Sequence, residues 1–331
     1  MGGWIILPFI ILLNRIKFMN KLKIAVLDSG FDFHRQLQNP IVYSNSFSSE
    51  LSPIDKNGHG TCIITLIDSI GTNIEIYNMA ILDKNREGNL CSLKSALKES
   101  IKKDVNIVNL SLGIENMSVD SELEGILLEC CRKKIILVTT TSNRGKLNYL
   151  AQYKDILSIQ SRNHNRVNND LLKLNPAAFF VDNIPRVVPW INGTYKLSGA
   201  NSFLTPFLIK NLYQINKSKN DLEESYKVLL KLQPSSILRL SPKQLEIKRD
   251  CLIDKSLYKR MISNSIITDM YNSDGKLIIE NATSENVTRL VKLINSITKL
   301  NYINNLIWIS DIMFIENLTN KLLSIKEDSY G

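Results

Sequence analysis

The sequence predicts an α/β fold with a mostly parallel central sheet, followed by a small and mainly helical C-terminal domain. Three short runs of apolar, often β-branched residues each end in a polar turn, which is typical of buried strands. The longer segments between them carry apolar residues at spacings of three and four, which indicates helices. Strands that alternate with helices predict a parallel sheet covered on both faces.

The predicted strands and helices follow one another in the first 150 residues. The strands are "KIAVLDSG" (residues 23 to 30), "VNIVNLSLG" (105 to 113) and "KKIILVTTTSNRG" (133 to 145). The helices are "SLKSALKESIKK", which starts at Ser92, and "VDSELEGILLECCRKK", which starts at Val119.

A polar residue comes just after the apolar part of each predicted strand: Asp28, Ser111 and Asn143. In open parallel sheets, ligands bind beyond the carboxyl ends of the strands. We therefore expect these three side chains to converge at one edge of the sheet and to form part of a site.

The composition changes near residue 218. Before it, "RVVPWINGTYKLSGANS" is typical of strands and a turn, and "FLTPFLIKNLYQI" of a helix with an early proline. The segment "NKSKNDLEES" is a candidate linker, and a Lys-, Asn- and Ile-rich segment follows it. We therefore expect three parts: an apolar extension (1–18), a first domain (19–217) and a helical accessory domain (218–331).

The apolar run at residues 4–13 is too short to span a bilayer. Positive charges follow the run rather than precede it, at Arg15 and Lys17, and no small-residue cleavage site is evident, so the run does not fit a secretory signal. Met19 begins "MNKLKIAVLD", which is typical of a protein start. Residues 1–18 are therefore either an upstream-start artefact or a tail with weak membrane contact.

Composition narrows the classes of partner. With 44% hydrophobic and 22% charged residues the chain is typical of a folded protein, and its formal net charge is +9. Lys and Arg are scattered, without an Arg stripe or zinc-finger spacing, so we expect no nucleic-acid partner.

No carboxylate-rich calcium loop is evident, and we expect no metal and no cofactor. The odd cysteine count favours a reducing, cytoplasmic compartment; the cysteines are Cys62, Cys91, Cys130, Cys131 and Cys251.

The stretch "NGHGTC", residues 57 to 62, places His59 between two glycines. It could be a loop that caps a helix, or it could present a catalytic imidazole. Peptide hydrolysis by a serine needs a base, an acid that orients the base, and donors for the oxyanion. The chain offers Asp, His, Asn and Ser in this order.

Five stretches together resemble the subtilisin-like serine peptidases. "VLDSG" is similar to that family's aspartate motif, "NGHGT" to its histidine motif, and "NLSLG" to its substrate-binding strand. "LVTTTSNRG" is similar to the strand and turn that carry the oxyanion asparagine, and "SGANSFLTP" to the nucleophile motif. The resemblance covers roughly residues 23–215 and implies a three-layer subtilisin-like fold and serine endopeptidase activity.

The resemblance also implies roles for individual residues. Asp28 would orient the imidazole, His59 would be the general base and then the general acid, and Ser202 would be the nucleophile. The amide of Asn143, with the backbone N–H of Ser202, would form the oxyanion hole. The backbone of the substrate-binding strand would pair with an extended substrate; its residues are Ser111, Leu112 and Gly113.

The nucleophile motif departs from the family pattern, because Ala200, Asn201 and Ser202 replace the usual Gly-Thr-Ser. Ser198 is therefore an alternative nucleophile. Ser202 is favoured because it stands four residues before Pro206, as the family's nucleophile does, and because it opens a helix whose dipole favours negative charge.

The sequence leaves two functions open. The favoured one is a cytoplasmic endopeptidase that processes a specific peptide or protein, such as the leader of a ribosomally made peptide. Only 22 residues precede Lys23, too few for a folding propeptide. The alternative is a catalytically weak or inactive relative that binds peptides or acts as a scaffold. For residues 218–331 we expect a helical module for docking or dimerisation; an acyl-carrier-like bundle is the other possibility, although no Asp-Ser-Leu attachment motif is present.

Overall fold

The computed structural model describes residues 21–114, 119–141, 148–161, 175, 177–181, 185–231, 259, 261, 263–298, 312, 315, 317–319 and 322. At its centre lies a seven-stranded sheet in the order β2-β3-β1-β4-β5-β6-β7, and every pairing in it is parallel. The predicted fold class is thereby confirmed. The strands are β1 (Leu22–Asp28), β2 (Ile41–Ser46), β3 (Ile74–Ala80), β4 (Ile107–Leu110), β5 (Ile136–Thr140), β6 (Leu157–Ser161) and β7 (Ala178–Val181).

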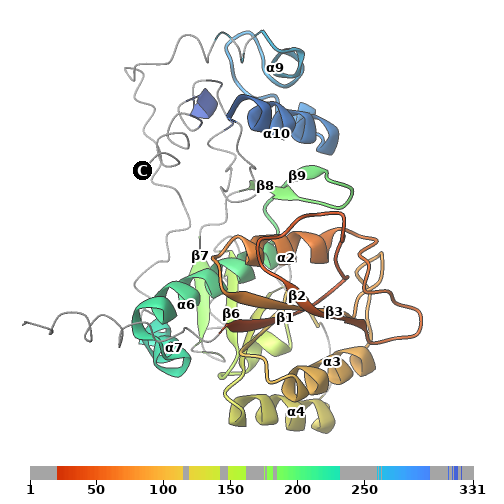
Figure 1. Ribbon diagram of the computed structural model, residues 1–331, viewed down its shortest axis with the longest axis vertical. Coiled ribbons are helices and arrows are strands. Elements are labelled where there is room, and N and C mark those ends of the chain that lie inside the picture. The colour runs from red at the N-terminus through yellow and green to blue at the C-terminus, as the bar shows by residue number, and fades with distance from the viewer. Residues whose placement is uncertain are drawn as a thin grey trace, which may run out of the picture.

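Helices cover both faces of this sheet (Figure 1). Strand β1 explains the arrangement, because successive side chains of a strand point to opposite faces. Ile24 and Val26 belong to the core beneath one helical layer, whereas Ala25 and Leu27 belong to the core beneath the other. The first layer contains α2 (His59–Asp68), α6 (Thr205–Lys219) and α7 (Leu222–Lys231). The second contains α3 (Leu90–Lys102) and α4 (Ser121–Arg132).

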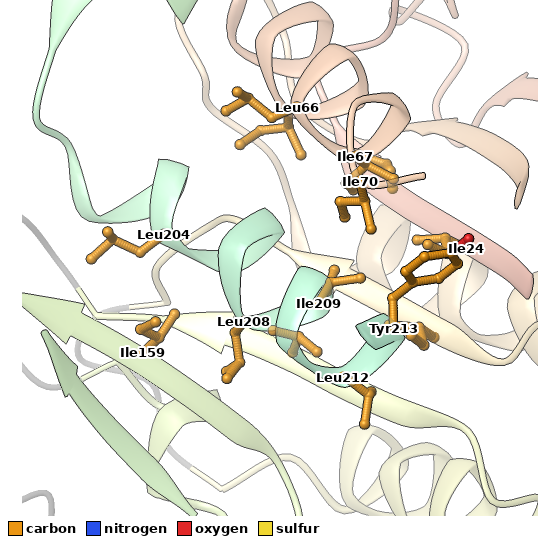
Figure 2. Packing of buried hydrophobic residues seen from close by; sticks show 14 of the residues in the cluster. Ile24, Leu66, Ile67, Ile70, Ile159, Leu204, Leu208, Ile209, Leu212 and Tyr213 are labelled. Carbon is orange, nitrogen blue, oxygen red and sulfur yellow. The ribbon is translucent and has the colours of Figure 1, made fainter. Parts of the chain in front are cut away.

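Helix α2 is buried along its whole length. It packs on the sheet and against α6, whose apolar side chains face those of α2 (Figure 2). Each apolar side chain that is fully buried there contributes about 1.5–3 kcal/mol. A 3₁₀ turn, η2 (Asn201–Leu204), leads directly into α6, and Pro206 lies in the first turn of α6, where no backbone hydrogen bond is lost.

Before η2 the chain forms an antiparallel hairpin of β8 (Arg186–Pro189) and β9 (Tyr195–Ser198). This agrees with the predicted strands and turn. The turn has Asn192 and Gly193 at its centre, with φ of 56° and 64°. Asn-Gly favours this left-handed pair of conformations, which matches the twist of the two strands.

A third core lies on the hairpin. It joins Val187 and Leu197 to α9 (Ser265–Met270), α10 (Ser284–Thr298) and helical residues between 312 and 322. We call these C-terminal elements, with the 3₁₀ turn η3 (Ile279–Asn281), the C-terminal unit. Its core is separate from the two cores of the sheet.

The predicted domain boundary near residue 218 falls within the last turn of α6. Helix α7 continues the first domain, because Leu229 is fully buried in the core shared with α2 and α6. We therefore propose that the first domain extends at least to Lys231. The predicted extension 1–18 lies outside the described residues, and within the described part of the chain no helix is long and apolar enough to cross a membrane.

Candidate active site

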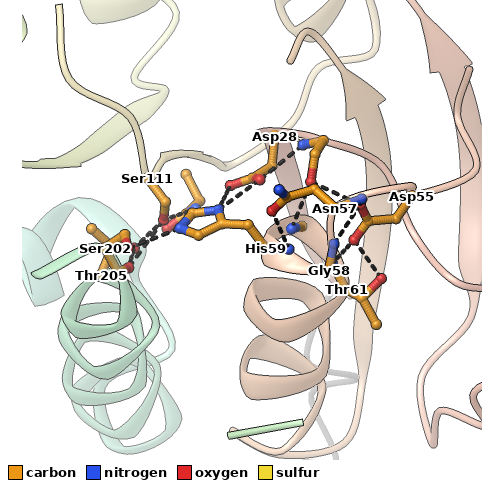
Figure 3. A network of polar contacts seen from close by, with 12 residues as sticks. Asp28, Asp55, Asn57, Gly58, His59, Thr61, Ser111, Ser202 and Thr205 are labelled. Atoms are coloured by element: carbon orange, nitrogen blue, oxygen red, sulfur yellow. Dashed lines mark hydrogen bonds and ion pairs between the residues drawn. The ribbon is translucent and has the colours of Figure 1, made fainter. Parts of the chain in front are cut away.

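Asp28, His59 and Ser202 meet at the carboxyl edge of the sheet, although they come from three different elements. Asp28 ends β1, His59 begins α2, and Ser202 lies in η2. His59 Nδ1 lies 2.8 and 2.9 Å from the two carboxylate oxygens of Asp28, and His59 Nε2 lies 2.8 Å from Ser202 Oγ (Figure 3). All three residues are at least 93% buried, since their exposed fractions are 1%, 3% and 7%.

These contacts define the roles of the two ring nitrogens. A carboxylate accepts hydrogen bonds, so Asp28 favours the tautomer of His59 with its proton on Nδ1. The backbone N–H of Ser29 donates to Asp28 Oδ1 at 2.8 Å and helps to hold the carboxylate in place. His59 Nε2 is then free to accept the proton of the Ser202 hydroxyl.

The loop before His59 depends on close backbone approaches at its two glycines. Gly58 has φ of 109°, a left-handed conformation that side chains disfavour, and a Cβ there would overlap the ring of Trp190. A Cβ on Gly60 would overlap the carbonyl of Gly30. The "GHG" pattern therefore places His59 against the Asp28 loop.

Asp55 stabilises the same loop through hydrogen bonds. Its Oδ1 accepts hydrogen bonds from the hydroxyl of Ser29 and from the backbone N–H groups of Asn57 and Gly58. Its Oδ2 accepts from both the backbone N–H and the hydroxyl of Thr61. One buried carboxylate thus joins the Asp28 loop to the start of α2 (Figure 3).

Ser111, the residue after β4, holds the turn that carries Ser202. Ser111 Oγ donates to the backbone carbonyl of Ser202 at 3.2 Å and lies 2.6 Å from Thr205 Oγ1. Asn201, which stands where the family has threonine, accepts a hydrogen bond from the backbone N–H of Ser161 in β6 at 3.1 Å. The unusual motif is therefore anchored to the sheet on both sides. It is Ser202, rather than Ser198, that contacts His59.

A cavity of about 490 Å³ opens beside His59 and Ser202. The predicted substrate-binding residues Ser111, Leu112 and Gly113 line it. Leu82, Leu90 and Leu93 line it as well, together with Arg86. Six of the seven predicted site residues therefore gather around one cleft, namely Asp28, His59, Ser111, Leu112, Gly113 and Ser202.

Asn143, the predicted oxyanion donor, lies outside the described residues, so its role stays a prediction. Among the residues that are described, no group of three or more His, Cys, Asp or Glu side chains could hold a metal ion.

The β8–β9 hairpin adds positive charge around the site. Arg186 is 3% exposed and donates to the carbonyl of Phe203, and burial lowers the pKa of Arg186 to about 10. Lys196 Nζ lies 3.0 Å from the centroid of the Trp190 ring, and burial lowers the pKa of Lys196 to about 8. Arg35 donates to the carbonyl of Trp190 at 2.9 Å, which ties the hairpin to the loop after β1.

The sequence analysis missed several residues that support the site. Asp55 had a recognisable signal, since an aspartate four residues before a loop histidine is well placed to accept hydrogen bonds from the backbone N–H groups of that loop. Trp190, Arg186 and Arg86 carried no such signal. Only the folded chain brings Trp190 against Gly58, Arg186 to the carbonyl of Phe203 and Arg86 to the cleft.

The chain belongs to the subtilase family, whose model matches residues 19–235. It is 34% identical over 164 residues to a thermostable alkaline protease of Halalkalibacterium halodurans, covering 46% of this chain and 44% of that protein. It is 33% identical over 155 residues to the minor extracellular protease Epr of Bacillus subtilis, covering 43% of this chain and 23% of Epr. The chain thus matches less than half the length of either relative.

A solved structure, a mutant of the protease domain of PatA, has the same fold. The TM-score is 0.52 at 14% identity, and the match covers 63% of this chain and 85% of that domain.

Proposed function

We propose that this protein is a serine endopeptidase that hydrolyses peptide bonds. One observation carries the proposal: the buried chain of contacts from Asp28 through His59 to Ser202, with ring-nitrogen distances of 2.8 to 2.9 Å. An aspartate, a histidine and a serine in this arrangement can activate the serine hydroxyl for attack on a carbonyl. Membership of the subtilase family supports the same activity.

In the proposed mechanism Ser202 Oγ attacks the carbonyl carbon of the scissile bond while its proton moves to His59 Nε2. Asp28 stabilises the resulting imidazolium through Nδ1 and is not itself protonated. The backbone N–H of Ser202 and the side-chain amide of Asn143 stabilise the oxyanion; losing one such donor typically lowers kcat by about 10²–10³. His59 then protonates the leaving amine, and a water activated by His59 hydrolyses the acyl-enzyme.

The substrate is an extended peptide segment. We propose that its backbone pairs with Ser111, Leu112 and Gly113 as an added strand, because these residues line the cleft directly beside the His59–Ser202 pair. Leu82, Leu90 and Leu93, which also line the cavity, suit apolar substrate side chains.

The finer proposal is that the enzyme processes a specific peptide, such as the leader of a ribosomally made peptide, in the cytoplasm. The four cysteines within the described residues are all unpaired, as expected in a reducing compartment. A docking or dimer role for the C-terminal unit stays a prediction.

Labelling with a fluorophosphonate probe tests the activity, because the probe reacts with an activated serine and not with one that is merely exposed. We expect an adduct on Ser202, found by mass spectrometry, that is lost in Ser202→Ala and His59→Ala and kept in Ser198→Ala. Failure of well-folded protein to react would overturn the peptidase proposal in favour of the peptide-binding or scaffold alternative.

Specificity needs a separate measurement. Purified enzyme should cut a defined set of peptides at few sites and degrade casein slowly. Broad degradation of casein without preference among the peptides would contradict the processing role while leaving the peptidase activity intact.

A further inference from the structure

Residues 82 to 88 form a tight hairpin at the cleft. This hairpin brings a single permanent charge to the cavity. Among the described residues that line the cavity, Arg86 alone carries a permanent charge, and none is acidic. The carboxylate of Asp28 is 1% exposed and already bonded to His59, so it offers nothing to a substrate cation.

Backbone and side-chain hydrogen bonds hold this hairpin together. Leu82 and Gly88 pair as an antiparallel bridge, and the backbone N–H of Arg86 donates to the carbonyl of Asp83 at 3.0 Å. The carboxylate of Asp83 bonds within the hairpin: it accepts hydrogen bonds from the backbone N–H groups of Asn85 and Glu87, each at 2.8 Å. Asn57, two residues before His59, donates to the carbonyl of Lys84 at 2.7 Å. The hairpin is thus fixed relative to the catalytic histidine.

Arg86 is an unusual residue for its place in this turn. Its φ is 66°, a left-handed conformation that favours glycine or asparagine after a turn of this kind. The turn itself therefore gives no reason for an arginine. The side chain is exposed and forms no ion pair with any described residue, so its charge is available to a ligand.

A second cation lies near Arg86. The positive charge of Arg86 acts on Lys196 and contributes to the lowered pKa of that side chain. Lys196 is not among the residues that line the cavity, so Arg86 is the described lining cation that can attract anionic groups into it.

We propose that Arg86 selects substrates with an aspartate or glutamate on the acyl side of the scissile bond, two to four residues before it. The inference rests on the proposed peptidase function. His59 and Ser202 mark the position of the scissile bond, and Ser111, Leu112 and Gly113 mark the path of the preceding residues. Arg86 lines the same cavity as that path, and its guanidinium can bind a carboxylate there through two parallel hydrogen bonds.

A library of peptides derived from a whole proteome is digested first, and the cleaved sequences should be enriched in Asp and Glu at these positions. Matched peptides that differ only by Glu or Gln at the enriched position are then compared. We expect kcat/KM to be about three- to tenfold higher for the Glu peptide, the range for a partly exposed charge-assisted pair. The ratio should fall at high salt.

Variants connect this preference to Arg86. Arg86→Gln should bring the Glu/Gln ratio to about one, and Arg86→Glu should make a Lys peptide better than the Gln peptide. Lys84→Gln is the matched control on the same hairpin; Lys84 does not line the cavity, and this variant should keep the ratio of the wild type.

The outcomes separate this inference from the proposed function. Equal cleavage of Glu and Gln peptides by an enzyme that reacts with the fluorophosphonate would overturn the acidic preference and leave the peptidase standing. An unchanged ratio in Arg86→Gln would assign the preference to another residue and also overturn the inference. Absence of both cleavage and labelling would overturn the peptidase function and this inference with it.

Discussion

The backbone N–H of Tyr195 donates a hydrogen bond to Thr288 Oγ1 at 2.8 Å, which joins strand β9 to helix α10 of the C-terminal unit. The carbonyl of Tyr195 accepts hydrogen bonds from Ser284 Oγ at 2.8 Å and from Thr288 Oγ1 at 3.2 Å. Strand β9 ends at Ser198, four residues before Ser202. The C-terminal unit therefore holds the strand that leads into the turn that carries Ser202.

Thr288→Val should weaken this connection and lower activity. Valine has nearly the same shape but cannot accept the hydrogen bond of Tyr195, and an unsatisfied buried donor costs about 1–3 kcal/mol. We expect a lower free energy of unfolding in urea and slower fluorophosphonate labelling. Ser296→Ala, on an exposed part of the same helix, is the control and should change neither. Labelling at the wild-type rate in Thr288→Val would show that the contact is structural only.

Gly58→Ala should both destabilise the protein and impair the site. The left-handed φ costs a residue with a Cβ about 1–2 kcal/mol, and overlap with Trp190 adds about 1–3 kcal/mol. The double variant Gly58→Ala/Trp190→Leu should recover only the stability that is lost through overlap with Trp190. Gly125→Ala, in helix α4, meets no atom within 4 Å and should be neutral or slightly stabilising. Thermal unfolding of the four proteins measures these differences; full recovery in the double variant would contradict the role of φ.

Asp55→Asn should misplace His59. An amide presents one NH₂ group to a pocket in which all five contacts are donors, so at least two hydrogen bonds are lost. We expect a loss of about 2–4 kcal/mol in unfolding free energy. In folded protein, kcat should fall more than KM rises, because the role we propose for His59 is in the chemical step.

Asp120→Asn is the control for this change, because Asp120 caps helix α4 through the N–H of Leu123 and asparagine caps helices equally well. This variant should retain stability and kcat. An Asp55→Asn enzyme with normal kcat at reduced stability would limit Asp55 to a structural role.

Lys196 should make stability depend on pH above neutrality. Its pKa is about 8 in the folded protein and near 10.5 when unfolded, so the unfolded chain binds more protons between these values. The unfolding free energy of the wild type should therefore rise relative to Lys196→Gln as the pH increases from about 8 to about 10. Urea unfolding across this range measures the difference. A constant difference would mean that contact with the Trp190 ring keeps the ammonium charged.

Much of the site could be predicted from the sequence because its parts are local. A strand that ends in Asp28 and a loop with His59 between glycines each carry their own signal within a few residues. Their convergence follows from a general rule about parallel sheets. The choice of Ser202 over Ser198 had only weak local support, and contact with His59 favours Ser202.

The sequence by itself determined the parallel α/β architecture and pointed to Asp28, His59 and Ser202 as a candidate triad, because periodicity and short motifs are properties of adjacent residues. Only the tertiary structure decided that α7 packs in the core with α2 and α6, that the C-terminal unit holds β9, and that Arg86 lines the cleft. Tyr195 and Thr288 are 93 residues apart, and their contact depends on the core that the β8–β9 hairpin shares with the C-terminal unit. No spacing along the chain encodes such a contact, because it forms only when distant apolar surfaces are buried against one another.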